Sequence, residues 1–163
     1  MYYISTRNRA MRVRAHEAIL QGLAPDGGLF VPERFPELDT EDLKRLCAMD
    51  FVDRVRFILS LYLDDFSADE ISGFAADAYS PSKFPAANGE REVAPTRQAP
   101  VSKVGNEYFL ELWHGPTCAF KDMALQMLPR LLSASLEKSG RRSNVLILTA
   151  TSGDTGKAAL EGF

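Results

Sequence analysis

The sequence predicts an α/β protein, with a mainly helical N-terminal part followed by the start of a domain built on a parallel β-sheet. Apolar residues recur at helical spacing through much of residues 13–79. A proline-containing stretch over residues 80–99 then interrupts any regular element. From residue 107 the pattern alternates between strand and helix with short links, which is typical of a parallel sheet with right-handed crossovers.

The N-terminal part predicts a series of short elements. Residues 2–7 fit an edge strand, residues 13–23 a helix, and PDGGLFVP (25–32) a turn with a brief extended segment after it. Three more helices are expected, at 39–48, 51–63 and 67–79, the last opened by a capping box at Ser67. The many acidic residues here fall at predicted helix ends or on exposed faces, without a histidine among them. We therefore interpret them as caps and solvated faces, and expect no metal site.

The composition excludes several classes of protein. Of 163 residues, 45% are hydrophobic and 25% charged, as in ordinary globular proteins, and the net charge of −3 argues against a nucleic-acid binder. No apolar run approaches the roughly 18 residues that would span a membrane. Two distant cysteines do not make a disulfide framework, which favours the cytoplasm. The arginines of residues 1–16 faintly resemble a targeting peptide, but residues 2–4 fit a strand better.

The second half predicts a strand at 107–113, a helix at 121–138, a buried strand at 144–149 (NVLILT) and a helix from Asp154. Pro129 should kink or split the first of these helices. We place a domain boundary near residues 91–97, which gives domains 1–95 and 96–163. Two strands do not make a stable open sheet, so we expect the second domain to be truncated.

HGPTCAFKD (114–122) carries the first candidate functional residue. Lys121 stands at a predicted helix start, where the macrodipole is positive, and has the apolar neighbours Phe120 and Met123. Such surroundings weaken the preference of a lysine for its charged form, and a neutral amine can form a Schiff base. The alternative is an exposed lysine on a solvated helix face.

TATSGDTG (149–156) carries the second group of candidate functional residues. It follows a predicted strand and opens a helix, which is where open α/β sheets bind ligands, and the helix N–H groups there would hold a carboxylate or phosphate. An ordinary turn capped by Ser152 or Asp154 is the alternative. An NTPase phosphate loop does not fit, because Thr151 and Ala158 stand where it needs Gly and Ser or Thr. A lysine amine facing an anion-binding loop suits a pyridoxal-phosphate (PLP) enzyme that acts on an amino acid.

The two motifs, together with HEAILQGLAPDGGLFVP (16–32) and DFVDR (50–54), resemble the threonine synthase family of fold type II PLP enzymes. The resemblance covers nearly the whole chain. It implies a threonine-synthase-like domain at 1–95 and an incomplete PLP-dependent α/β catalytic domain at 96–163. It also implies that Lys121 binds PLP and acts as the catalytic acid–base group, beside Phe120 and Asp154 at the cofactor. The residues that it implies for substrate binding are Thr117, Thr151, Ser152, Gly153, Asp154 and Thr155. Residues 114–117 would shape the pocket.

The implied reaction converts O-phosphohomoserine and water into L-threonine and phosphate, catalysed by a carbon–oxygen lyase that acts on phosphates. The family's phosphate loop lies further along such chains, so we expect an N-terminal fragment that is inert alone and holds PLP weakly or not at all. Another PLP lyase of this fold, such as a threonine or serine dehydratase, and a non-catalytic binding module are the alternatives. The sequence does not indicate an oligomeric state.

Two residues of the first motif have open roles. Cys118 is either a reactive thiol near a helix start or, as we favour, a small pocket filler. His114 either does acid–base work or fixes the turn.

Overall fold

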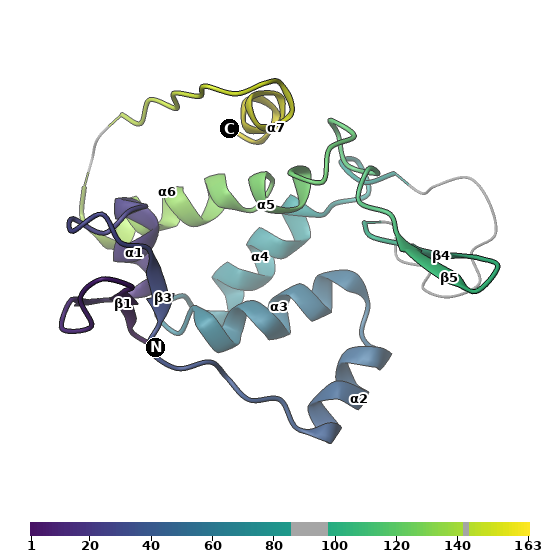
Figure 1. The fold of residues 1–163 in the computed structure, drawn as a ribbon, viewed down its shortest axis with the longest axis horizontal. Coiled ribbons are helices and arrows are strands. Elements are labelled where there is room, and N and C mark those ends of the chain that lie inside the picture. The colour runs from purple at the N-terminus through teal and green to yellow at the C-terminus, as the bar shows by residue number, and fades with distance from the viewer. Residues whose placement is uncertain (86–97, 142–143) are drawn as a thin grey trace.

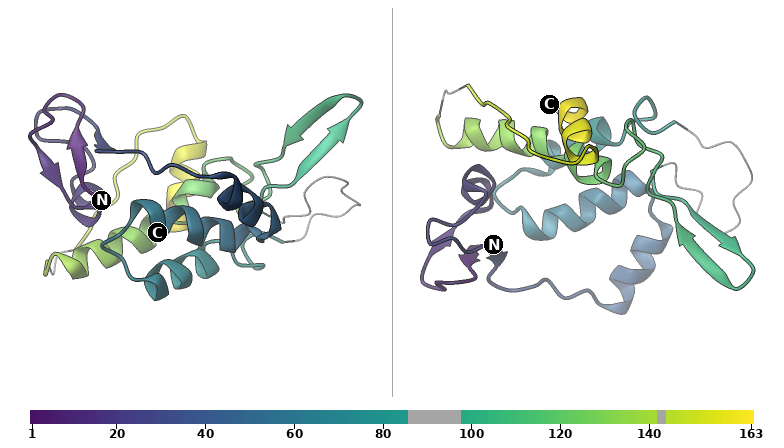
Figure 2. Two further views of the ribbon diagram at one scale, coloured as in Figure 1. Left: turned by 90° about the horizontal axis from the view of Figure 1, so that it is seen from below. Right: turned by 45° about the horizontal axis from the view of Figure 1, so that its top comes forward.

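The computed structural model describes residues 1–85, 98–141 and 144–163 (Figure 1). A small sheet near the N-terminus packs against a group of helices, and a β-hairpin extends from the opposite end (Figures 1 and 2). The predicted domain boundary at 91–97 lies outside the described residues. No helix in the described part is long and apolar enough to cross a membrane. The same residues contain no group of three or more His, Cys, Asp or Glu side chains that could hold a metal ion.

The first sheet has three antiparallel strands, β1 (Tyr3–Ser5), β2 (Arg12–Val13) and β3 (Phe30–Pro32), in the order β2-β1-β3. The strand predicted at 2–7 is confirmed as β1, but its predicted edge position is wrong, because β1 lies between two partners. Helix α1 (Ala15–Gln21) follows β2 and ends at Gly22, whose φ of 68° suits glycine.

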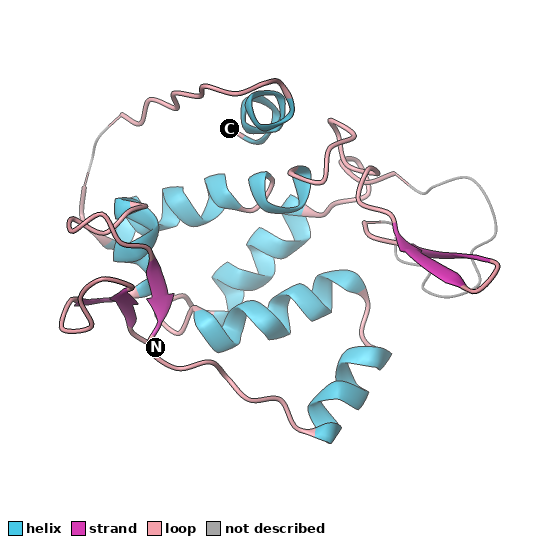
Figure 3. Cartoon of the chain, viewed as in Figure 1, coloured by secondary structure: helices cyan, strands magenta, loops and turns pink. Residues whose placement is uncertain are grey.

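Helices α2 (Thr40–Ala48), α3 (Phe51–Tyr62) and α4 (Ala68–Ala78) confirm the three predicted helices (Figure 3). Each begins after a residue whose side chain accepts a backbone N–H bond from the first turn. These N-caps are Asp39, Asp50 and Ser67. Such caps satisfy N–H groups that the helix itself leaves without a partner.

The predicted helix at 121–138 is two helices, α5 (Asp122–Leu125) and α6 (Leu128–Lys138). Pro129 lies in the first turn of α6, where its missing N–H costs nothing, and this confirms the predicted split. Helix α7 (Asp154–Gly162) begins at the predicted residue.

The hydrophobic core joins α6 to the N-terminal helices. One cluster of buried side chains contains Ala15, Leu63, Phe66, Ile71 and Ala134, and a second contains Ala75, Ala78, Tyr79, Phe84 and Met127. Both clusters combine residues from before and after the predicted boundary. The segment that follows HGPTCAFKD is therefore anchored on the N-terminal part.

The predicted parallel sheet is not formed among the described residues. Strand β5 (Glu107–Leu110) pairs antiparallel with β4 (Val101–Val104), which the sequence analysis did not predict. A two-residue Gly-Asn turn links them, with φ of 61° at Gly105. This dipeptide between two apolar runs is a hairpin signal that would have found β4.

The NVLILT segment (144–149) forms no strand, so the prediction of a buried strand there is wrong for this structure. Its residues are all exposed, with Leu146 at 85% and Leu148 at 89% of their full accessibility. A strand exists only with a hydrogen-bonding neighbour, and none of the described strands pairs with this segment.

Candidate active site

HGPTCAFKD folds as a compact turn that leads into α5. The Cys118 N–H donates to the Gly115 carbonyl over 3.1 Å, and the Asp122 N–H donates to the Ala119 carbonyl over 3.0 Å. Lys121 lies at the N-cap position of α5, and its own carbonyl accepts from Leu125 over 2.9 Å. The backbone of the candidate lysine is thus fixed at the start of a helix, as predicted.

A fully buried carboxylate lies under this turn. The Thr117 N–H donates to Asp122 Oδ2 over 2.9 Å, and the Thr117 hydroxyl donates to Oδ1 over 2.7 Å. No local sequence pattern predicts the burial of Asp122. An acid at a helix start is usually read as an exposed cap, and its burial comes from the fold of the turn.

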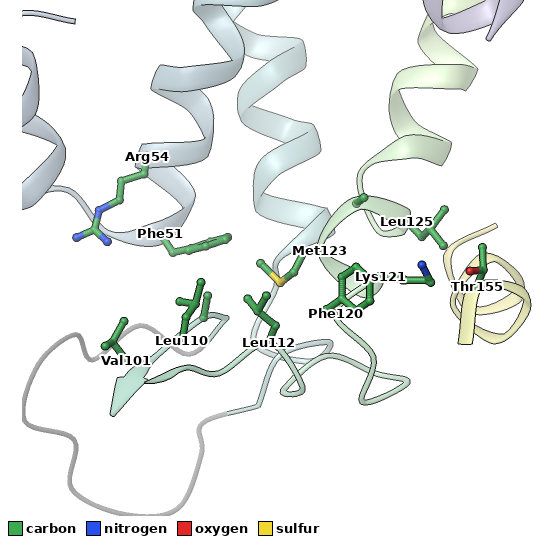
Figure 4. A pocket seen from close by; sticks show the side chains of 12 residues that line it. Phe51, Arg54, Val101, Leu110, Leu112, Phe120, Lys121, Met123, Leu125 and Thr155 are labelled. Atoms are coloured by element: carbon green, nitrogen blue, oxygen red, sulfur yellow. The ribbon is translucent and has the colours of Figure 1, made fainter. Parts of the chain in front are cut away.

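Lys121 lines a pocket of about 780 Å³ with mostly apolar walls, which is within the usual range for small-molecule sites. The lining residues are Phe51, Arg54, Ala99, Val101, Leu110, Leu112, Phe120, Lys121, Met123, Ala124, Leu125 and Thr155 (Figure 4). Lys121 Nζ lies 4.5 Å from the centroid of the Phe120 ring. The lysine is half-buried among apolar side chains, so the alternative of a fully solvated lysine does not hold.

The second motif reaches the same pocket through one residue, Thr155. Ser152 and Asp154 are exposed and do not line this pocket. Gly153 precedes α7 with φ of 147°, a conformation open to glycine, and its N–H donates to Thr151 Oγ1 over 3.3 Å.

Close packing between α7 and α5 brings the two motifs together. Ala158 and Ala159 are buried in α7, and a Cβ atom at Gly162 would lie 2.2 Å from the Leu125 carbonyl oxygen. Small residues on one face of α7 thus allow the two backbones to approach. Figure 2 shows α7 beside α5, and Figure 4 places Lys121 between Phe120 and Thr155.

Thr117 and Cys118 differ from expectation in where their side chains lie. The Thr117 hydroxyl is buried and bonded to Asp122, and Thr117 does not line the pocket. Cys118 is exposed and has φ of 58°, so the interpretation as a pocket filler is wrong.

His114 contacts Glu111, with 2.6 Å between His114 Nε2 and Glu111 Oε2. Both side chains are largely buried. This contact joins the start of the motif to the segment that leaves β5, which favours the turn-fixing role of His114 over acid–base work.

The N-terminal part supplies one wall of the pocket, although its sequence contains no candidate site residue. Phe51 and Arg54 come from α3, and the Arg54 Nε donates to the Leu46 carbonyl over 2.8 Å. Tyr79 supports Met123 from behind, because its hydroxyl donates to the Met123 carbonyl over 2.6 Å. Burial raises the pKa of Tyr79 to about 12, so its hydroxyl remains a donor at neutral pH. Long-range contacts of this kind leave no local signal in sequence.

Residues 2–79 match the family described as "Threonine synthase N terminus". Over 163 residues the chain is 41% identical to the threonine synthase of Pseudomonas aeruginosa, a match that covers 99% of this chain and 32% of the relative. It is 40% identical over 151 residues to "Threonine synthase-like 1" of Homo sapiens, covering 90% of this chain and 19% of that protein.

Solved structures of threonine synthases also match this chain. A PLP-bound threonine synthase from Brucella melitensis matches with a TM-score of 0.85 at 35% identity, covering 100% of this chain and 33% of that one. The Escherichia coli threonine synthase matches with a TM-score of 0.81 at 32% identity, covering 100% and 34%. The chain therefore spans about a third of the length of the relatives that it matches.

Proposed function

We propose that the chain is part of a PLP-dependent threonine synthase. In support, residues 2–79 match the N-terminal family model, and the whole chain is similar in sequence and fold to about a third of known threonine synthases. In this proposal it supplies the lysine that binds the cofactor and the loop that binds the substrate carboxylate. The reaction converts O-phosphohomoserine and water into L-threonine and phosphate. We also propose that the chain divides into domains 1–95 and 96–163, and that the protein acts in the cytoplasm.

One observation carries the proposal: Lys121 and Thr155, which lie in two separate motifs, line the same pocket. A reaction at an amino-acid substrate needs a reactive amine and an anion-binding group within reach of one small molecule. The start of α7, where Thr155 lies, points free N–H groups outward and favours a carboxylate.

The residues of this pocket fit PLP. Its volume of about 780 Å³ accommodates a small aromatic cofactor, and the Lys121 amine is accessible from within it. The Phe120 side chain offers an apolar face beside the amine. Asp154 is assigned to the cofactor from the resemblance alone. When bound, PLP supplies an electron sink for the substrate Cα.

The chain's own residues would divide the remaining work. Lys121, once released from the cofactor by the substrate, would move protons at the substrate carbons within its reach. Thr151, Ser152, Gly153, Asp154 and Thr155 would hold the substrate carboxylate through hydroxyl and backbone donors. Apolar residues of the wall, such as Leu112 and Met123, would exclude water from the reacting carbon.

The test is a fusion of these 163 residues to the remaining two thirds of the Pseudomonas aeruginosa relative. The fusion should release phosphate from O-phosphohomoserine and form L-threonine, while Lys121→Ala should abolish both. Lys157→Ala is the matched control, because Lys157 is exposed in α7 and does not line the pocket. Removing a catalytic nucleophile costs on the order of a thousandfold or more in rate, so the two lysines should separate clearly.

Different products would redirect the assignment. A folded fusion that deaminates threonine or serine to a keto acid, and forms no threonine, would support the dehydratase alternative. A folded fusion that shows neither reaction and retains no PLP after dialysis would support a binding module.

A further inference from the structure

Asp122 holds the turn from which Lys121 enters the pocket. Its side chain is completely buried, and both carboxylate oxygens accept hydrogen bonds from Thr117. The two donors are the backbone N–H and the hydroxyl of the same residue. Because both oxygens are bonded to one residue, this contact ties the turn to the first residue of α5 at two points.

Gly115 makes room for the carboxylate. A Cβ atom at this position would lie 2.5 Å from Asp122 Oδ2 and 2.6 Å from Asp122 Cβ. Real atoms do not approach so closely, so any side chain at 115 would displace the carboxylate or the turn. Gly115, Thr117 and Asp122 therefore form one unit that depends on all three residue types.

This unit leaves little freedom to the backbone of Lys121. On one side, its carbonyl accepts the N–H groups of Ala124 and Leu125 over 3.1 and 2.9 Å. On the other side, the next residue is held by Thr117. What remains free is the lysine side chain, which extends along the Phe120 ring into the pocket.

We infer that Asp122 is a positioning residue: through its two hydrogen bonds to Thr117 it fixes the direction in which the Lys121 amine is presented to the pocket. The relevance of this position for cofactor binding rests on the proposed function. The inference also gives Thr117 a different part from substrate binding, because its hydroxyl is already engaged.

Chemical labelling of the 163-residue chain tests the inference. PLP is added in limiting amount, the product is reduced with borohydride, and labelled peptides are quantified by mass spectrometry. The ratio of labelling at Lys121 to that at Lys44, an exposed lysine on α2, is compared with the same ratio in urea-unfolded chain. The quotient of the two ratios is here called the selectivity, and it differs from one where the fold changes the reactivity of Lys121 relative to that of Lys44.

Two pairs of variants separate hydrogen bonding from charge. Asp122→Asn keeps both contacts, because its amide oxygen accepts the Thr117 N–H while its amide group donates to the Thr117 oxygen, whereas Asp122→Ala removes both. Thr117→Ser keeps the hydroxyl and Thr117→Val removes it at similar volume. Asp69→Ala is the control for loss of an acid from a first helical turn, since Asp69 is exposed in α4.

We expect wild type to show a selectivity clearly different from one. Asp122→Asn, Thr117→Ser and Asp69→Ala should stay within about twofold of it, since each keeps the hydrogen bonds that matter here. Asp122→Ala should bring the selectivity to one, and Thr117→Val should move it part of the way. If Asp122→Ala does not fold, the difference in selectivity between Thr117→Val and Thr117→Ser tests the inference in its place.

Three results would overturn the inference: a wild-type selectivity of one, an unchanged selectivity in folded Asp122→Ala and Thr117→Val, or a loss in Asp122→Asn equal to that in Asp122→Ala. Failure of the proposed function is a separate result. It is measured as absence of threonine formation by the wild-type fusion, whatever the labelling of the chain shows.

Discussion

At the scale of single residues, Asp65 joins the N-terminal sheet and α1 to the helices that follow. Its Oδ2 accepts the His16 backbone N–H over 3.0 Å and lies 2.7 Å from the His16 ring Nδ1, with Arg14 Nε at 3.9 Å. Burial alone would raise the pKa of Asp65. The hydrogen bonds from His16 outweigh burial and leave this pKa below its ordinary value.

This lowered pKa makes the stability of the fold depend on pH. A carboxylate whose folded pKa lies below its unfolded value contributes stability above about pH 4, and that contribution is lost as the pH falls through the folded pKa. We therefore expect urea unfolding to show wild type more stable than Asp65→Asn near neutral pH. The difference should shrink as the pH falls below 4, a threshold set by the approximate reference pKa of aspartate.

Asp69→Asn is the control, because it removes the same charge from an exposed position. Its unfolding free energy should stay close to wild type at every pH. A gap between wild type and Asp65→Asn that stays constant down to the lowest pH would contradict a role for the ionised carboxylate.

Local sequence patterns predict Lys121 as a site residue, but they do not predict the residues that pack around its pocket. Lys121 and the hydroxyl loop could be predicted, because a lysine among apolar residues and a strand-to-helix turn rich in glycine and hydroxyls are local patterns. Phe51 and Tyr79 look like ordinary core residues in sequence. Their place beside or behind the pocket depends on the docking of α3 and α4 against α5, which no local pattern encodes.

At the scale of elements, the β4–β5 hairpin depends on the conformation of Gly105. Its φ of 61° is unfavourable for residues that carry a Cβ, although no atom lies within 4 Å of where that Cβ would be. We expect Gly105→Ala to destabilise the hairpin by about 1 kcal/mol through backbone strain alone. Amide hydrogen exchange in residues 101–110 would measure this.

Gly73 is a glycine whose replacement by alanine should stabilise the chain. It lies inside α4 with ordinary helical φ, and a Cβ there would also meet open space. Gly73→Ala should therefore stabilise α4 by roughly 0.5–1 kcal/mol. Equal effects of the two substitutions would mean that φ at Gly105 is not what limits the hairpin.

Helices were predictable in this chain because their signals are local. Asp39, Asp50 and Ser67 cap helices within three residues of themselves, and Pro129 marks the break between α5 and α6. The strands at 2–7 and 107–113 were also predicted, but their partners were not, because pairing depends on residues elsewhere in the chain. The alternation of strand and helix predicts a parallel neighbour for the strand at 107–113, whereas the structure pairs it locally and antiparallel with β4.

At the scale of the whole molecule, the NVLILT segment (144–149) exposes apolar side chains to solvent and pairs with none of the described strands. Exposed extended segments of high β-propensity and no charge associate with one another. We expect the isolated chain to self-associate with rising concentration, and Leu148→Glu to reduce this association. Sedimentation velocity over a range of concentrations would measure the effect.

Leu43→Glu is the matched control, since Leu43 is also exposed but lies within α2, where its backbone groups are engaged. It should leave the concentration dependence unchanged. A chain that remains monomeric at all concentrations would contradict the prediction, and so would equal effects of the two glutamates.

The shared core also has a consequence for the order in which the chain folds. Lys138 Nζ lies 2.9 Å from Glu70 Oε2, a contact between residues 68 positions apart, and Ala134 of α6 packs in one cluster with Ala15 of α1. Contacts between distant positions are slow to form, because the loop between them must be closed first. During synthesis, α1, α3 and α4 leave the ribosome well before α6, so the clusters that include Met127 and Ala134 cannot be completed until these residues follow. The segment from Gly115 to Gln126 lies between α4 and α6 in the chain, so the turn that carries Lys121 is placed when the core is completed. Thr155, from the later helix α7, is added to the pocket after it.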